Sequence, residues 1–430
     1  MNREILALAI PNILSNISVP LLSTVDTALM GRLSEMHIGA VGVGAMIFNF
    51  VYWNFGFLRM GTTGMTAQAF GKGDQKEISL NLSRPVFVAL ILGGLILLLQ
   101  NPLGQLSVQL MQTDDAVTPF IFTYFNIRIW AAPATLLIYV LMGWFFGMQN
   151  AVYPLLLTLF INIININFSY LFVFKLGWDI DGVAWGTVIA QYAGLFAAVC
   201  ILVIKYPLLI RKISFIETTQ WQAFKVFLRV NRDIFIRTFF LTFAFGFFYA
   251  KSSIFGAEIL AVNVILLQYV NWMSYGIDGF AFASESLVGK YFGASDRKSF
   301  FRAVKLSFLW SFAMAAMLSF VYFVAGDRML QVFTDQTDVI QSAQPYLFWM
   351  ILFPLIAFAC YIWDGIFIGM TASVAMRNTM AIALVIYLGS YYFLVPNLGN
   401  HGLWMSLLIF LAARGLLQFG IFRHRKMELH

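Results

Sequence analysis

The sequence predicts an all-α polytopic membrane protein, with twelve transmembrane helices in two pseudo-symmetric six-helix bundles around a central cavity. Of the 430 residues, 60% are hydrophobic and only 11% are charged. Soluble domains carry about 25% charged residues, so most of this surface must face lipid. Apolar runs of about 20 residues, the length that crosses a bilayer, recur between short polar breaks. The two halves of the chain also resemble each other in sequence.

The first expected helix, residues 5–31, follows a short charged start, as the apolar part of a signal peptide does. However, it contains Pro11 and Asp26, and no small-residue cleavage site follows it. We therefore expect it to be retained as the first transmembrane helix.

Glycine, proline and charged residues mark the breaks between the expected helices. The first six cover residues 5–31, 38–69, 79–101, 118–146, 152–174 and 183–204. The second six cover residues 233–255, 260–289, 303–325, 343–369, 374–395 and 402–422. The expected domains are an N-terminal lobe (1–204), a cytoplasmic linker (205–232), a C-terminal lobe (233–422) and a cytoplasmic tail (423–430).

Basic residues indicate the orientation, because Lys and Arg in short loops are retained on the cytoplasmic side. With both termini inside, about twenty of them fall in or beside cytoplasmic segments and about four fall outside. We therefore expect an integral protein of the cytoplasmic (inner) membrane with both termini in the cytoplasm. The net charge of +7 does not indicate nucleic-acid binding, since the basic residues lie mostly in loops.

The two halves match at an offset of about 222 residues. A G-x-x-D-x-K turn follows both the second and the eighth span, with its aspartate at Asp74 and Asp296. A Gly-x-Phe-x-Gly-Met block begins at Gly143 and again at Gly365. Such a repeat is typical of secondary transporters, in which two bundles rock about a central cavity to give alternating access.

Four acidic side chains lie well within the expected spans, where each charge costs about 2.5–3.5 kcal/mol near the helix centre. Asp26 lies in the outer part of the first span, where burial would disfavour its anion and allow it to bind and release a proton. The alternative is an aspartate near the interface that caps neighbouring hydroxyls. Asp278 and Glu285 are seven residues apart and share one face of the eighth span. We expect Asp364, in the tenth span, to face the same cavity.

Arg59, Arg128 and Arg414 are arginines that also lie well within expected spans. Arg59 and Arg128 offer an alternative explanation for the acids of the second half, because they would neutralise these carboxylates in structural pairs. We expect Arg414, in the twelfth span, to contribute to packing.

The fifth span carries a polar stripe. Asn162, Asn165 and Ser169 recur at spacings of three and four residues and therefore lie on one side of the helix. Thr187, on the sixth span, would join them. Such a stripe lines either a hydrated cavity or a helix contact, and we expect a cavity of the N-terminal lobe.

Six sequence blocks resemble the multidrug and toxic compound extrusion (MATE) family, specifically its DinF-type branch, over nearly the whole chain. They are SVPLLSTVDTA (18–28), LRMGTTG (58–64), NRD (231–233), YGIDGFA (275–281), YIWDGIFIG (361–369) and GNHGLW (399–404). Each block alone is weak, but together they are highly specific.

The resemblance implies a secondary antiporter that exports amphipathic or organic cations against proton or sodium flow. It places Asp26 on the aspartate associated with cation coupling and Pro11 where the first helix bends. It also places Asn165 and Thr187 in the same cavity. One departure is Ser169, which stands where family members often carry a second aspartate, so the resemblance gives no support for paired-carboxylate chemistry in this lobe.

Proton coupling is the preferred hypothesis. Sodium coupling is the alternative, because Asp26 with oxygens of Asn165, Ser169 and Thr187 would form a hard-ligand site, and the acids of the C-terminal lobe another. A flippase for lipid-linked precursors is a further alternative, which predicts a more cationic cavity.

An enzyme is not expected, because no HExxH, GxSxG or P-loop motif occurs. The expected partners are small amphipathic or cationic substrates and the lipid bilayer. We expect a monomer with no metal site and no cofactor other than the coupling ion.

Overall fold

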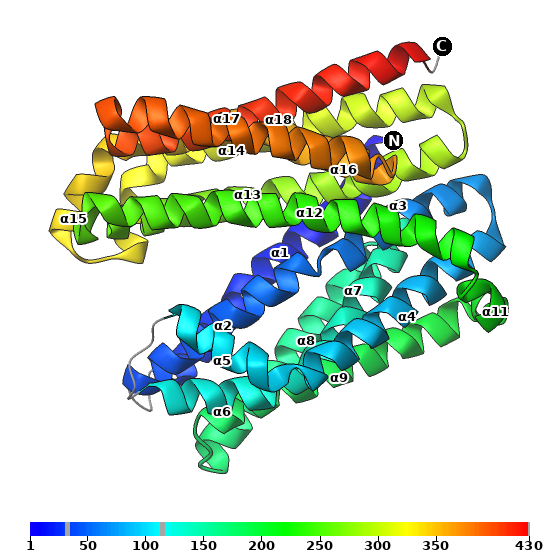
Figure 1. The fold of residues 1–430 in the computed structure, drawn as a ribbon, viewed down its shortest axis with the longest axis horizontal. Coiled ribbons are helices and arrows are strands. Elements are labelled where there is room, and N and C mark those ends of the chain that lie inside the picture. The colour runs from blue at the N-terminus through cyan, green and yellow to red at the C-terminus, as the bar shows by residue number, and fades with distance from the viewer. Residues whose placement is uncertain (31–34, 112–116, 429–430) are drawn as a thin grey trace. The chain divides into compact units, whose positions relative to one another are not determined.

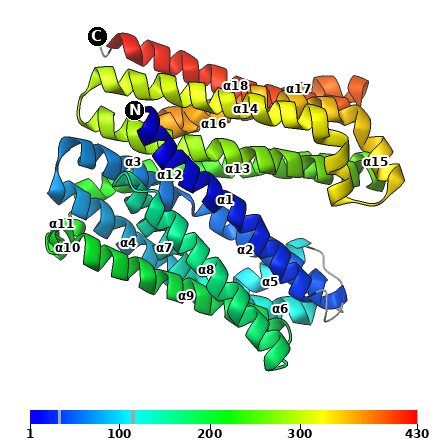
Figure 2. The same cartoon turned by 180° about the vertical axis from the view of Figure 1, so that it is seen from behind.

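The computed structural model describes residues 1–30, 35–111 and 117–428. Within these ranges, its description of side chains leaves out residues 19–30, 35, 36, 38, 110, 111, 215, 223 and 425–428. The described residues form helices joined by turns and contain no strand. Figures 1 and 2 show these helices from opposite sides. Ten helical segments of the described part are long and apolar enough to cross a membrane.

In the first half of the chain, the described residues form nine α-helices, a 3₁₀ turn and a π-helical turn. They are α1 (Asn2–Met30), α2 (Glu35–Asn54), α3 (Phe57–Lys72), α4 (Gln75–Leu98), α5 (Gln100–Met111), α6 (Thr118–Arg128), η1 (Ile129–Ala131), α7 (Ala132–Gly147), α8 (Val152–Tyr170), η2 (Leu171–Lys175) and α9 (Ile180–Lys205). Each of the six spans expected here coincides with one helix or with a pair of helices. Helix α5 is not among the expected spans.

The second half follows the same plan after two short linker helices. The elements are α10 (Pro207–Ile210), α11 (Phe215–Thr218), α12 (Trp221–Ser252), η3 (Ser253–Phe255), α13 (Ala257–Gly293), α14 (Arg297–Phe333), α15 (Thr337–Ala343), η4 (Gln344–Tyr346), α16 (Leu347–Gly369), α17 (Ser373–Leu398) and α18 (Asn400–Glu428). The expected all-α fold is therefore confirmed.

One expected span is interrupted because of a proline. Pro133 has no N–H group to donate to the carbonyl oxygen of Ile129, four residues earlier. The N–H of Ala132 binds that oxygen instead, which tightens residues 129–131 into the 3₁₀ turn between α6 and α7. The expected span at residues 38–69 is likewise divided, at Phe55 and Gly56, into α2 and α3.

The chain forms two compact units. The amino-terminal unit comprises residues 14–228, and the carboxy-terminal unit comprises residues 1–13 and 229–430. The expected first lobe includes residues 1–13, whereas in the structure they pack with the second half. Both divisions fall inside helices, in α1 two residues after Pro11 and in α12 between Leu228 and Arg229.

The internal repeat reappears in the backbone. Positive φ angles occur at Gly73 and Ser295, at Gln149 and Thr371, and at Gly177 and Gly399, each pair separated by 222 residues. The aspartates of the two G-x-x-D-x-K turns, Asp74 and Asp296, each cap the following helix by accepting a backbone N–H bond at 3.0 Å. The two halves therefore share local geometry as well as sequence.

The repeated glycines allow the same close helix contact in both units. An added Cβ at Gly143 of α7 would overlap the carbonyl oxygen of Arg59 in α3. Its counterpart at Gly365 of α16 would overlap the carbonyl oxygen of Ala281 in α13. Small residues at these positions therefore let the helix backbones approach each other, as membrane helix interfaces require.

We expect Gly365→Ala to destabilise the carboxy-terminal unit, because the added methyl group must push α13 and α16 apart. Overpacking of this kind costs about 1–3 kcal/mol. Thermal unfolding of the purified protein in detergent measures the loss. Gly389→Ala in α17 is the matched control, since no described atom lies within 4 Å of its added Cβ. If both variants unfold at the same temperature, the proposed clash is wrong.

Candidate functional site

The polar residues of α8 and α9 meet in the interior of the amino-terminal unit. Asn165 is 1% exposed, and its Nδ2 donates a hydrogen bond to Thr187 Oγ1 at 2.9 Å. Thr187 Oγ1 in turn donates to the carbonyl oxygen of Val183 at 3.1 Å. The structure therefore brings together two residues that the sequence analysis assigned to one cavity.

Two buried polar atoms beside this pair have no hydrogen-bond partner among the described residues. They are Asn165 Oδ1 and Ser169 Oγ. Ser169 is fully buried where α8 approaches α9, and an added Cβ at Gly186 would overlap its hydroxyl. An unsatisfied buried polar group costs about 1–3 kcal/mol, so such groups call for a functional explanation.

Helix α1 runs parallel to α8 in the amino-terminal unit. Ser15 Oγ donates to Thr158 Oγ1 at 2.9 Å, and Asn162 Nδ2 lies 3.2 Å from both the carbonyl oxygen and the hydroxyl of Ser18. These contacts join residues that are 143 and 144 positions apart. Because both helices rise equally per residue, the same register brings position 26 to the level of Ser169.

Asp26 belongs to α1, but its side chain lies outside the described residues. Its role as the coupling carboxylate therefore stays a prediction, supported by register alone. Asn162 serves the α1–α8 contact through its Nδ2, which is the second of the two uses expected for the polar stripe.

In the carboxy-terminal unit, Asp364 is the centre of a buried ion network. Its Oδ2 accepts hydrogen bonds from Arg237 of α12 and, at 2.5 Å, from Arg414 of α18. Its Oδ1 accepts a hydrogen bond from Gln418 Nε2 at 2.8 Å. All four residues are buried. Both oxygens of Asp364 are therefore already bound by groups of the protein itself.

Asp278 adds a second negative charge to this network. It lies on α13, is half-buried, and interacts electrostatically with Arg237. Arg237 therefore interacts with two carboxyl groups, those of Asp364 and Asp278. Glu285, on the same helix, is 1% exposed, and its backbone carbonyl lies against Gly369 of α16.

The described residues contain no cluster of three or more His, Cys, Asp or Glu side chains that could hold a metal ion.

The comparisons with known proteins agree with the fold and the repeat. The MatE family model matches residues 11–171 and 234–393. The chain belongs to the MATE family.

Sequence relatives support this membership along the whole chain. The chain is 38% identical over 419 residues to DNA damage-inducible protein F of Escherichia coli, covering 97% of this chain and 91% of the relative. It is 22% identical over 349 residues to the probable multidrug resistance protein NorM of Thermotoga maritima, covering 80% and 75%. The chain is therefore an integral membrane efflux transporter and not an enzyme.

A solved structure has the same fold. The outward-facing conformation of a multidrug resistance MATE family transporter of the MOP superfamily aligns with a TM-score of 0.90 and 18% identity. The alignment covers 100% of this chain and 96% of that one. This agreement confirms the two-bundle helical architecture expected from the sequence.

The arginine partners in this MATE chain differ from those expected. Arg59 and Arg128 were candidates for neutralising the acids of the second half, but Arg237 and Arg414 bind Asp364. Arg128 donates to the Tyr124 hydroxyl at 2.5 Å and lies 4.9 Å from the centre of the Phe48 ring. Packing is the role expected for Arg414, and that expectation is wrong, because Arg414 forms a buried ion pair with Asp364.

Arg237 belongs to this buried network but is not among the charges singled out from the sequence. The signal was nevertheless present, because Arg237 lies inside the expected span 233–255, where an arginine needs a partner.

Proposed function

We propose that this MATE transporter exports small amphipathic organic cations in exchange for protons by alternating access. Asp26 is the proposed proton carrier. The proposal rests mainly on two buried atoms without a described partner, Ser169 Oγ and Asn165 Oδ1. Ser169 lies at the level that the register assigns to position 26, and Asn165 lies one helical turn earlier on α8. We further propose a monomer in the cytoplasmic membrane with both termini in the cytoplasm.

The two atoms suit the two protonation states of a carboxyl group. Asn165 Oδ1 can only accept a hydrogen bond, which is what a protonated carboxyl group offers. The hydroxyl of Ser169 can donate one, which is what a carboxylate needs. Proton uptake and release at Asp26 would thus exchange one hydrogen bond for another, and each protonation state would favour a different arrangement of the bundles.

Sodium is the second candidate coupling ion, because the same site offers oxygen atoms. Asn165 Oδ1, Ser169 Oγ and Thr187 Oγ1 are the hard ligands that such a cation prefers. In the carboxy-terminal unit, Asp364 offers no such site, since both of its oxygens are bound. These ion pairs also argue against a flippase for lipid-linked precursors. Such a flippase needs free positive charge to bind phosphate, whereas Asp364 neutralises Arg237 and Arg414.

Efflux from proteoliposomes, with pH and sodium gradients imposed independently, tests the proposal. We expect a pH gradient to drive export of a fluorescent organic cation without sodium. A sodium gradient alone should leave export at the rate of empty liposomes. Export that follows sodium and ignores pH would overturn proton coupling.

Ser169→Ala separates the two ions further. Proton binding by a carboxyl group survives the loss of one neighbouring hydroxyl, so pH-driven export should fall less than about tenfold, one hydrogen bond being worth about 1 kcal/mol. A sodium site would lose a direct ligand, and its apparent sodium affinity would weaken by more than about tenfold. Transport rates against sodium concentration distinguish these results.

A further inference from the structure

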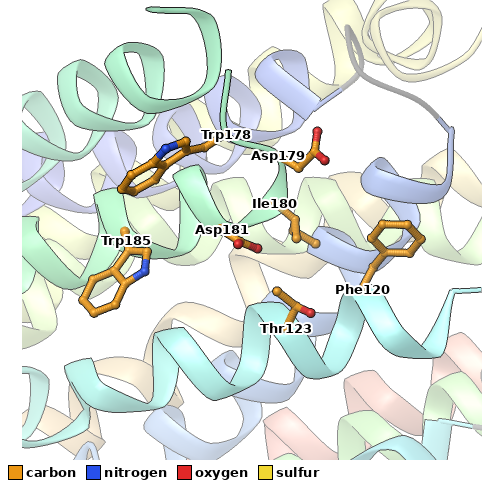
Figure 3. Close-up of a pocket in the computed structure, with 7 residues that line it drawn as sticks. All are labelled: Phe120, Thr123, Trp178, Asp179, Ile180, Asp181 and Trp185. Carbon is orange, nitrogen blue, oxygen red and sulfur yellow. The ribbon is translucent and has the colours of Figure 1, made fainter. Parts of the chain in front are cut away.

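A pocket lies within the amino-terminal unit, at the end that the predicted orientation places outside. It has a volume of about 520 Å³, within the range of about 300–1,000 Å³ typical of small-molecule sites. Figure 3 shows the indoles of Trp178 and Trp185 on one side and Phe120 of α6 on the other, with Asp181 between them. Asp179 lines the upper part of the pocket in this view.

The fold holds the walls of this pocket in place. Gly177 adopts a φ of 69°, which turns the chain back after η2. The N–H of Trp178 then donates to the carbonyl oxygen of Phe172 at 2.9 Å. The indole of Trp178 stacks on the Phe172 ring with 4.7 Å between centroids. The aromatic wall is thus formed before any ligand binds.

The chemistry of the lining favours a positively charged aromatic or alkyl ligand. Trp178 and Trp185 are 42% and 40% exposed, so each indole keeps accessible surface. Indole is the best side chain for cation–π contact. Asp179 and Asp181 supply negative charge, and no Lys or Arg lines the pocket in the described part of the chain. His37 Nε2 lies 3.9 Å from Asp179 Oδ1, while no ion pair within the described residues involves Asp181.

We propose that this pocket binds a bulky organic cation, such as a quaternary ammonium or phosphonium ion, between its indoles and its two aspartates. The site is separate from the buried Asn165–Thr187 pair and would hold a cation at the outer end of the amino-terminal unit. Its role in export rests on the proposed function, but binding itself does not.

Binding of tetraphenylphosphonium to the full-length protein in lipid nanodiscs tests the proposal. Equilibrium dialysis measures both the dissociation constant and the number of bound ions. We expect Asp179→Asn/Asp181→Asn to weaken binding at one class of site at least tenfold. The matched control is Asp335→Asn/Asp338→Asn, two exposed aspartates close together in the other half, which should leave binding unchanged.

The indole is tested separately at Trp185, whose exposure makes misfolding of its variants a minor concern. Trp185→Phe keeps a ring face and should retain binding within about threefold, whereas Trp185→Leu should weaken binding about tenfold, because only the aromatic residue supplies cation–π contact. If Trp185 merely anchors the helix at the membrane interface, Trp185→Leu binds as the wild type does, and the proposal fails.

The proposal also fails if the Asp179/Asp181 variant binds normally or if the control pair weakens binding equally. The variant Asp26→Asn distinguishes failure of the pocket proposal from failure of the proposed function. Normal pH-driven export by Asp26→Asn would overturn the coupling role and leave the pocket standing. If the pocket variants lose tetraphenylphosphonium binding at this site and Asp26→Asn keeps it, the result supports the pocket whatever the coupling role of Asp26.

Discussion

Asp26→Asn is expected to reduce export driven by a pH gradient to the rate of protein-free liposomes. An amide cannot take up and release a proton near neutral pH. Residue 26 would therefore have the same protonation state throughout the transport cycle. The loss should be complete because position 26 carries the only carboxylate that the sequence assigns to the amino-terminal cavity. Efflux of a fluorescent organic cation from proteoliposomes measures it.

The control for this experiment is Asp338→Asn, which removes an exposed carboxylate in the other half of the chain. It should export at the wild-type rate. Thermal unfolding of both variants separates loss of coupling from loss of folded protein. Wild-type export by Asp26→Asn under an imposed pH gradient would remove Asp26 from the mechanism.

Among the variants proposed for this protein, Asp364→Asn should lower the free energy of unfolding the most. It leaves the guanidinium groups of Arg237 and Arg414 in the interior without their shared counter-ion. Breaking a buried ion pair by removing one partner costs about 3–5 kcal/mol, because the remaining charge stays desolvated. We expect a lower unfolding temperature in detergent, together with a lower yield of folded protein.

A double-mutant cycle tests this explanation. Arg414→Gln should destabilise the wild type strongly but cost much less when Asp364 is already Asn, because the two residues act as one unit. Asp335→Asn, an exposed site in the same unit, serves as the control. Additive effects of the two changes would show that the pair is not coupled and would contradict the network.

The positions of the helices could be predicted from the sequence because each follows from local composition. Apolar length and charged breaks define a span, and the spacing of Asn165 and Ser169 defines a face. The repeat was also accessible, since its turns depend on local residues such as Asp74 and Asp296, which cap helices in the structure.

The choice of ion-pair partners could not be predicted, because it depends on how helices pack. Asp364, Arg237 and Arg414 lie on three helices that are far apart in sequence. Spacing within one helix gives no information about which arginine reaches which carboxylate. Helix α5 could not be predicted for a different reason. Its twelve residues are too few to span a bilayer, so a search for spans assigns them to a loop.

The two covalent connections between the compact units run through the interiors of α1 and α12 rather than through loose loops. Any displacement of one unit against the other must therefore bend or unwind a helix. Pro11 removes one backbone hydrogen bond close to the first connection, whereas α12 contains no proline. Elastic resistance to such displacement should thus be unequal at the two connections, with α1 as the compliant joint and α12 as the stiff one.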